Sequence, residues 1–310
     1  MRKIKNIMLM LVALVLATGC IKEDYDDCDN VTIYFQYLAD GDTDVLYQYM
    51  RRVDLYVFDE GGHLLGTRQY SQDELSSFSA KPSFKLPAGK RYKVVALGNA
   101  YDDTEVVNLN ATSFDDIFIQ SPNWGSGEDV TCHDHNYLGQ KEFFVAGGDG
   151  VMTRDTVTLY SSHVNVSVEI HGLPAPANND IIYQLSIENS NARTSFNNEV
   201  DTEEKGTIYP ELIWDSQDNC YRTDDLALFR MDDGGNLHAD CCAHSLVLTN
   251  GETGEELIRG NIYDYLQRYD DVIDVTEQEA DLPISINFHG ITAVIELPDW
   301  VLVSGEPDWN

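Results

Sequence analysis

The sequence of 310 residues is poor in basic side chains and in proline. It has 20 Lys and Arg but 53 Asp and Glu, which gives a net charge of −33. A charge of this sign repels nucleic acids and anionic lipid headgroups. Nucleic-acid binding is therefore excluded first. The 9 prolines and 22 glycines follow no period, which excludes collagen-like and low-complexity chains. With 43% hydrophobic and 10% aromatic residues, the chain can build two globular domains.

The first twenty residues are typical of a secreted lipoprotein. Three basic residues precede an apolar run at 7–18, which is too short to span a bilayer. Residues 17–20 read Ala-Thr-Gly-Cys, which resembles the lipobox cut by the lipoprotein signal peptidase. We predict that residues 1–19 are removed and that Cys20 carries the lipid. The alternative is an ordinary signal peptide with an incidental cysteine. No later apolar run is long enough to cross a membrane.

Residues 20–30 form a short acidic linker after the predicted lipid. Lys22, Glu23 and Asp24 resemble the export signal that places lipoproteins on the outer surface of some Gram-negative bacteria; the alternative is a solvated linker. Two or more acyl chains hold a protein stably on a membrane, so a fully acylated Cys20 would remain there. Removing residues 1–19 deletes three basic residues and no acidic residue, which leaves 17 − 53 = −36.

The remaining cysteines would lie in an oxidising compartment. If Cys20 is lipidated, five are left: Cys28, Cys132, Cys220, Cys241 and Cys242. At most two disulfides can form, and one thiol stays free. The adjacent pair does not easily meet disulfide geometry. We favour Cys28 with Cys132, and Cys220 with either Cys241 or Cys242.

Most segments alternate with the period of a β-strand. Residues 53–58 and 63–65 flank a glycine turn and predict one hairpin, and residues 84–86 and 92–97 predict a second. Residues 164–170 predict a strand with one buried face, and residues 284–288 and 291–297 predict a final hairpin. Helical signals are few, at 71–77, 113–119 and 257–269.

Many short strands with regular turns predict an all-β fold of two tandem β-sandwiches. The strand at 156–160 looks like the last of one sandwich, and Val164 opens the next with hardly any linker. We therefore place one domain at 31–161 and another at 162–310. Such a short joint favours a rigid rod.

Several features in this order resemble the FimB-type family of fimbrial anchor lipoproteins. They are the lipobox followed by Cys28, the hairpin sequence Val-Asp-Leu-Tyr-Val-Phe-Asp at 53–59, and Phe-Lys-Leu-Pro-Ala-Gly-Lys-Arg-Tyr-Lys-Val-Val-Ala-Leu-Gly-Asn at 84–99. The resemblance is strongest over 16–99. It implies two transthyretin-like β-sandwiches that sit at the base of a fimbria, tie it to the cell outer membrane and limit its length. It also implies a fimbrial shaft subunit as partner, donor-strand exchange among the subunits, and an anchor that keeps its lipidated N-terminus.

A strand from one subunit can fill an open groove in another and satisfy its unpaired backbone. The best donor candidate is the segment 291–303, which is terminal and alternates at Ile291, Ala293, Ile295 and Leu297. The alternative is that this segment completes the sheet of its own domain.

The sequence gives only weak signals for a metal site or a catalytic site. Residues 132–135 read Cys-His-Asp-His, and His238, Cys241, Cys242 and His244 form a second cluster, but neither has a known zinc spacing. Asp40, Asp42 and Asp44 are not an EF-hand, because Val45 replaces its glycine. No phosphate loop or hydrolase motif occurs. We predict no metal, no cofactor and no catalysis.

A rival class is a surface lipoprotein that binds glycans for nutrient capture. Exposed tryptophans stack on sugars, and the candidates are Trp124, Trp214, Trp300 and Trp309. We expect core or rim packing for Trp214 and Trp300. A fimbrial tip or accessory subunit is a further alternative, because it would share the same sandwiches.

Overall fold

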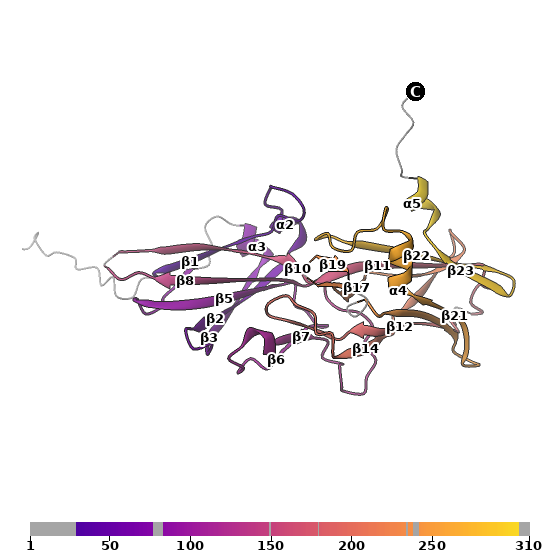
Figure 1. Cartoon of the computed structure of the whole chain (residues 1–310), viewed down its shortest axis with the longest axis horizontal. Helices are drawn as coiled ribbons and strands as arrows, with labels where there is room; N and C mark the ends of the chain where they lie inside the picture. The colour runs from indigo at the N-terminus through magenta and orange to yellow at the C-terminus, as the bar shows by residue number, and fades with distance from the viewer. Residues whose placement is uncertain are drawn as a thin grey trace, which may run out of the picture.

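The computed structural model describes residues 29–76, 83–148, 150–178, 180–233, 235–237 and 242–303. The molecule is elongated, with the N-terminal strands at one end and the C-terminal strands at the other (Figure 1). Sheets dominate, and the predicted all-β fold is confirmed. No described helix has the length and apolarity needed to cross a membrane. Cys20, the export signal, Cys28, Cys241 and Trp309 lie outside the described residues.

The N-terminal half is a sandwich of two sheets. One sheet has the order β10-β8-β5-β2-β3 and the other β4-β1-β9. The strands are β1 (Val31–Gln36), β2 (Arg52–Asp59), β3 (Leu64–Ser71), β4 (Ser83–Phe84), β5 (Lys90–Gly98), β8 (Tyr137–Val145), β9 (Thr153–Thr158) and β10 (Tyr160–Ser161). Both faces of β2 are buried. Val53, Leu55 and Val57 face the core between the two sheets, while Tyr56 and Phe58 face a second core behind β2.

The first predicted hairpin is confirmed, because β2 pairs with β3. The second prediction, at 84–97, is wrong. β4 pairs with β1, whereas β5 pairs with β2 and β8 in the opposite sheet. The buried Leu86 lies in the connection, so the chain crosses from one sheet to the other there. A turn sequence shows where a chain reverses, but not which strand it pairs with next.

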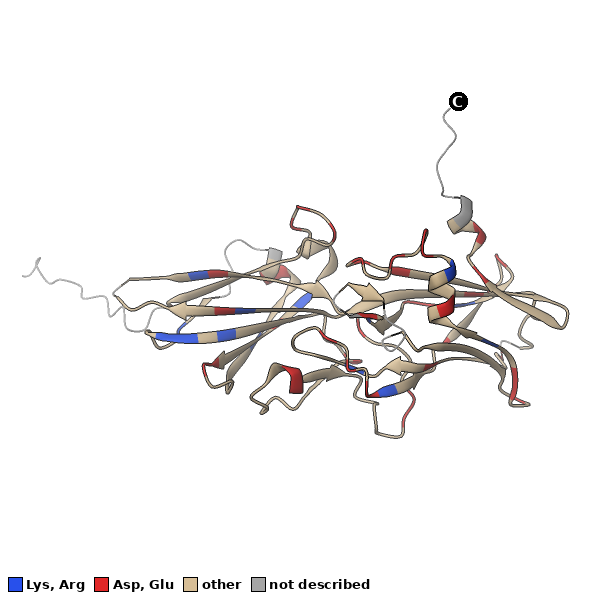
Figure 2. Cartoon of the chain, viewed as in Figure 1, with Lys and Arg blue, Asp and Glu red and all other residues tan. Residues whose placement is uncertain are grey.

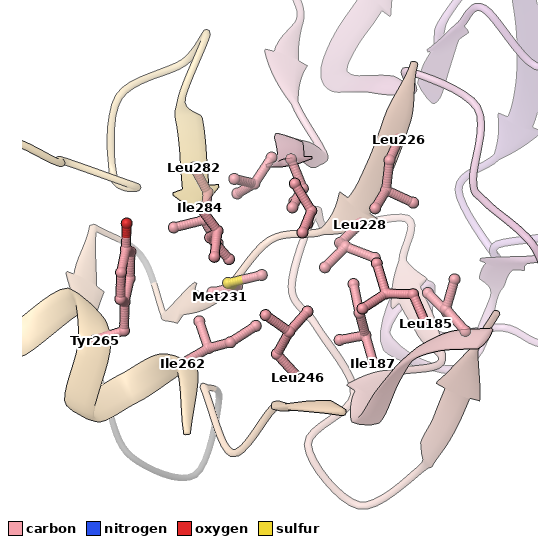
Figure 3. Packing of buried hydrophobic residues seen from close by; sticks show 14 of the residues in the cluster. Leu185, Ile187, Leu226, Leu228, Met231, Leu246, Ile262, Tyr265, Leu282 and Ile284 are labelled. Carbon is pink, nitrogen blue, oxygen red and sulfur yellow. The ribbon is translucent and has the colours of Figure 1, made fainter. Parts of the chain in front are cut away.

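The C-terminal half repeats the architecture. Its sheets have the orders β15-β16-β11-β22-β23, with β17 also on β11, and β14-β12-β20-β21. The strands are β11 (His163–His171), β12 (Tyr183–Asn191), β14 (Lys205–Ile208), β15 (Leu212–Asp215), β16 (Cys220–Thr223), β17 (Leu226–Phe229), β20 (Ser245–Asn250), β21 (Glu255–Asn261), β22 (Asp281–His289) and β23 (Thr292–Glu296). Figure 3 shows their aliphatic side chains packed around Met231.

Each half pairs its first strand in parallel with a late strand. β1 pairs with β9 from Val31↔Thr153 to Gln36↔Thr158, and β11 pairs with β22 from Asn165↔Asp281 to His171↔Asn287. The predicted strand at 164–170 and the final hairpin, β22 with β23, are both present. This repetition matches two tandem sandwiches.

Helices are short, as expected. They are α2 (Leu46–Tyr49), α3 (Gln72–Ser76), the 3-10 turn η2 (Phe114–Asp116), α4 (Ile262–Arg268) and α5 (Asp299–Val303). The predicted helix at 257–269 is only partly helical, because β21 continues to Asn261. The Asn261 side chain then accepts a hydrogen bond from the Asp264 amide at 2.9 Å and caps α4.

A small sheet connects the two halves. It consists of β6 (Glu105–Val107), β7 (Phe118–Gln120) and β13 (Arg193–Ser195), and β7 pairs with both others. The core behind β2 receives Phe196 and Phe229 from the second half of the chain. The remaining strand pair is β18 (Asp232–Asp233) with β19 (Asn236–Leu237). The division at 161/162 stays a prediction.

Candidate functional site

The predicted donor segment forms the edge of its own sheet. β23 pairs with β22 from Ser285↔Glu296 to His289↔Thr292 and has no strand on its other side among the described residues. Of the four predicted donor residues, Ile291 is fully exposed in the turn, Ala293 and Ile295 are half-buried, and Leu297 is buried. The alternation ends at α5, so the segment is a strand only to Glu296.

A groove separates this edge from the edge of the facing sheet. It has a volume of about 390 Å³ and lies between β21, β23 and α4, with Ile258, Arg259, Arg268 and Val294 in its lining. At its floor Gly260 and Ile295 come so close that a Cβ on Gly260 would overlap the Ile295 side chain. The edge strands β21 and β23 therefore nearly touch at Gly260 and Ile295, and the groove lies beside this contact.

The sandwich of the N-terminal half is filled by the chain's own first strand. β1 lies centrally between β4 and β9, and Val31 and Ile33 are fully buried. At its start, the Asn30 side chain exchanges two hydrogen bonds with the Leu86 backbone, at 2.8 and 2.9 Å. β1 is thus held in the centre of its sheet by contacts within the chain.

The two halves meet at a half-buried carboxylate. Glu279, from the C-terminal half, accepts hydrogen bonds from the hydroxyls of Tyr37 and, at 3.1 Å, Tyr137. Burial raises the pKa of Glu279, and burial beside this carboxylate also raises the pKa of both tyrosines, so their hydroxyls remain donors. Next to it, the Gln278 amide donates to Asp40 at 3.0 Å.

A buried arginine, Arg230, donates hydrogen bonds to the segment that precedes Glu279. The Arg230 guanidinium pairs with Asp232 at 2.6 Å and donates to the carbonyls of Glu277 and Val275, each at 3.0 Å. Its charge is therefore satisfied although the side chain is buried. Nothing in the sequence marked the contact of Glu279 with Tyr37 or of Arg230 with the Glu277 carbonyl, because these partners are far apart along the chain.

The four side chains at 132–135 point to separate partners. The Cys132 thiol lies 3.4 Å from an Asp103 oxygen, the His133 ring stacks on Phe229 at 4.0 Å, the Asp134 carboxylate accepts from the Tyr101 amide at 2.7 Å, and His135 lies 3.5 Å from Asp225. In the second cluster, His238 and Cys241 lie outside the described residues. His244 accepts from the Asn191 amide at 3.4 Å. No group of three potential metal ligands gathers in the described part of the chain.

The predicted disulfide pairing stays a prediction, because Cys28 and Cys241 lie outside the described residues. In the structure, Cys132 and Cys220 carry free thiols. Cys220 belongs to β16, whereas Cys242 is buried against the Met231 sulfur at 4.0 Å. Burial raises the pKa of the Cys132 and Cys220 thiols to about 11, so both stay protonated at neutral pH.

The exposure of the tryptophan side chains differs in part from the prediction. Trp124 is half-buried against β14, where its ring occupies the space a side chain on Gly206 would need. Trp214 packs edge-on against Tyr221 at 4.8 Å, as predicted. Trp300, for which we expected packing, is 54% exposed on α5. The chain is helical at this position, which strand periodicity could not predict.

The tandem sandwiches, with their first strands held in parallel pairs, define an all-β protein of the two-sandwich class. A family model described as Fimbrillin-A associated anchor proteins Mfa1 and Mfa2 matches residues 25–305, and the chain belongs to this family. The predicted resemblance to fimbrial anchor proteins is therefore confirmed. A search of curated proteins finds no match.

Solved structures share the fold at low sequence identity. The fimbrial anchor protein Mfa2 from Porphyromonas gingivalis is 18% identical, over 86% of this chain and 95% of that one, with a TM-score of 0.60. A candidate adhesin from Bacteroides ovatus is 15% identical, over 88% and 97%, with a TM-score of 0.64. A candidate polysaccharide-binding protein from Bacteroides thetaiotaomicron is 18% identical, over 86% and 95%, with a TM-score of 0.62. At 15–18% sequence identity, the structural similarity shows a shared fold and nothing about a shared function.

Proposed function

We propose that this chain is a lipoprotein that anchors a fimbria to the cell outer membrane through Cys20. Membership of the anchor family carries the proposal. The lipobox sequence supports it, and so does the position of the first described residues at one end of the long molecule (Figure 1). The anchor has a structural role, so we assign it no reaction and no cofactor.

We propose further that the anchor limits fimbrial length. A subunit that accepts a neighbour's strand must offer an open site in its sandwich. Here β1 fills the central position of its sheet. Hydrogen bonds of Asn30 with Leu86 and of Tyr37 with Glu279 hold its two ends. A lipidated N-terminus that is never removed keeps β1 in place, so the polymer cannot continue past this subunit.

The joint to the shaft subunit is proposed to be strand complementation, with 291–303 as the donor. β23 is suited to this because it is an edge strand held on one side only. Leaving its own sheet would break the five register positions with β22, and pairing in the shaft subunit would replace them. The exchange therefore conserves backbone hydrogen bonds.

The decisive experiment is Cys20→Ala in cells that make the fimbria. We expect fimbriae to appear in the culture medium, because the lipid is the proposed anchor in the membrane. The control is Cys132→Ala, which removes a thiol remote from the N-terminus. Fimbriae that stay on cells carrying Cys20→Ala would refute the anchoring role. Proteinase shaving of intact cells tests the export signal, and a protected protein would contradict surface exposure.

A second candidate function is glycan binding, which the exposed Trp300 ring favours. It predicts that the chain is retained on an immobilised polysaccharide and that Trp300→Ala abolishes the retention. An anchor without this activity would show none.

A further inference from the structure

The end of the N-terminal half that lies farthest from the C-terminal half is basic. Lys and Arg gather on β5 and at the start of β9 at this end, whereas acidic residues are spread over the loops of the C-terminal half (Figure 2). We call this surface the basic tip and define it by four cations and two apolar side chains: Lys85, Lys90, Arg91, Arg154, Phe144 and Val151.

Strand register brings the members of the basic tip together. Arg91 pairs with Phe144 in the β5–β8 ladder, and the Gly89 amide donates to the Val145 carbonyl at 2.8 Å. β9 begins beside β1, where the Thr153 amide donates to the Asn30 carbonyl at 2.8 Å. The β4–β5 and β8–β9 connections and the start of β1 therefore share one end of the sandwich.

The cations of the basic tip have no carboxylate partner. All four are exposed, and none forms an ion pair with the described residues. Elsewhere Arg193, Arg230 and Arg259 each pair with a carboxylate, whereas Arg68, Lys93 and Arg268 lie against aromatic rings. A chain with 53 acidic residues could supply such partners easily, so this end is left free to meet anionic groups from outside.

Apolar side chains stand beside these charges. Phe144 is 50% exposed and Val151 is 42% exposed, although both are large and apolar. An aromatic ring among basic residues is typical of a surface that meets lipid headgroups, because the ring enters the interface while the cations face phosphates.

The position of the basic tip identifies its partner. Asp29 is nine residues beyond Cys20, so the linker reaches at most roughly 30 Å at about 3.3 Å per residue. If the lipid sits at Cys20, the basic tip is the part of the molecule nearest the membrane. The rest of the chain carries the opposite charge and is repelled by an anionic surface.

We propose that the basic tip rests on the anionic surface of the bilayer that holds the Cys20 lipid, with its cations on phosphate groups and Phe144 in the headgroup layer. This rests on the proposed lipidation. Because the basic tip is at one end of the long axis, the contact holds the anchor upright and directs its C-terminal half away from the membrane (Figure 1).

The test uses the chain from residue 20 to 310 with Cys20→Ala, so that no acyl chain contributes. Vesicles of phosphatidylcholine alone are compared with vesicles that also contain phosphatidylglycerol, by co-sedimentation. We expect binding only to the anionic vesicles, weakened by salt. The pair Lys90→Gln and Arg91→Gln should lower partitioning about 25-fold, at about fivefold per basic residue.

The matched control is Arg222→Gln with Arg268→Gln, which makes the same change in charge on exposed residues of the C-terminal half. It should bind as the parent does. Equal loss in both pairs, or equal binding to both kinds of vesicle, would overturn the proposal. So would a Lys90 and Arg91 variant that binds vesicles normally yet loses fimbriae from cells, because the partner would then be a protein. Acyl detection at Cys20 is independent of these results, so a failure of the lipid anchor is told apart from a failure of the basic tip.

Discussion

Three buried histidines predict that the protein loses stability in mild acid. Burial lowers the pKa of His133, His163 and His244 from 6.5 to about 3. Neither ring nitrogen of His133 has a hydrogen-bond partner among the described residues. The unfolded chain binds protons below pH 6.5 that the folded chain cannot take up until about pH 3, so stability falls as the pH falls through this window.

The magnitude follows from the two pKa values. Between pH 7 and pH 5, one histidine with pKa 6.5 unfolded and about 3 folded removes about 2 kcal/mol from the free energy of unfolding. Three such groups remove about 6 kcal/mol, which is comparable to the whole stability of an ordinary domain. We therefore expect a marked loss of stability near pH 5.

His133→Leu tests this reasoning, with the free energy of unfolding measured by urea denaturation at pH 7 and pH 5. The variant should lose about 2 kcal/mol less than the parent between the two pH values. His289→Leu, on the surface, is the control and should follow the parent curve. A His133→Leu protein with the parent's full loss would show that this ring is protonated equally in the folded and unfolded states.

Three further outcomes are expected. Tyr37→Phe removes a hydroxyl that donates to the Glu279 carboxylate and should cost about 1.5–3 kcal/mol in urea unfolding; an unchanged midpoint would show that the contact contributes nothing. Gly139→Ala should cost about 1–3 kcal/mol in thermal unfolding, because its Cβ would overlap a β9 carbonyl, whereas Gly66→Ala meets open space and should be mild. Cys220, buried and with a thiol pKa of about 11, should be alkylated only after denaturation, and rapid labelling of the folded chain by mass spectrometry would contradict its burial.

Sequence reasoning succeeded where partners are close along the chain. The hairpin of β2 and β3 and that of β22 and β23 each follow from alternation around a glycine turn. It failed for residues 84–97, because the sheet that a strand joins depends on partners such as β1, far away in the sequence. The parallel pairing of β1 with β9 has no local signal for the same reason.

The candidate site was only partly foreseen. Alternation identified the edge segment at 291–297, but the carboxylate of Glu279 and its tyrosines are brought together only by folding. Net charge argued against anionic membranes, yet the four exposed cations of the basic tip lie together at one end of the molecule. A sum over the chain cannot show where each sign of charge accumulates.

The direction of β1 matters when the protein is under tension. β1 and β9 run the same way, and the chain leaving β9 leads through β10 into the C-terminal half. A pull on the start of β1, opposed by drag on the far half, acts along both strands. Their six paired positions must then slip past each other together, whereas peeling would break them one after another. If the chain is held at Cys20 as proposed, β1 is loaded in shear, and all six paired positions with β9 share the force at once.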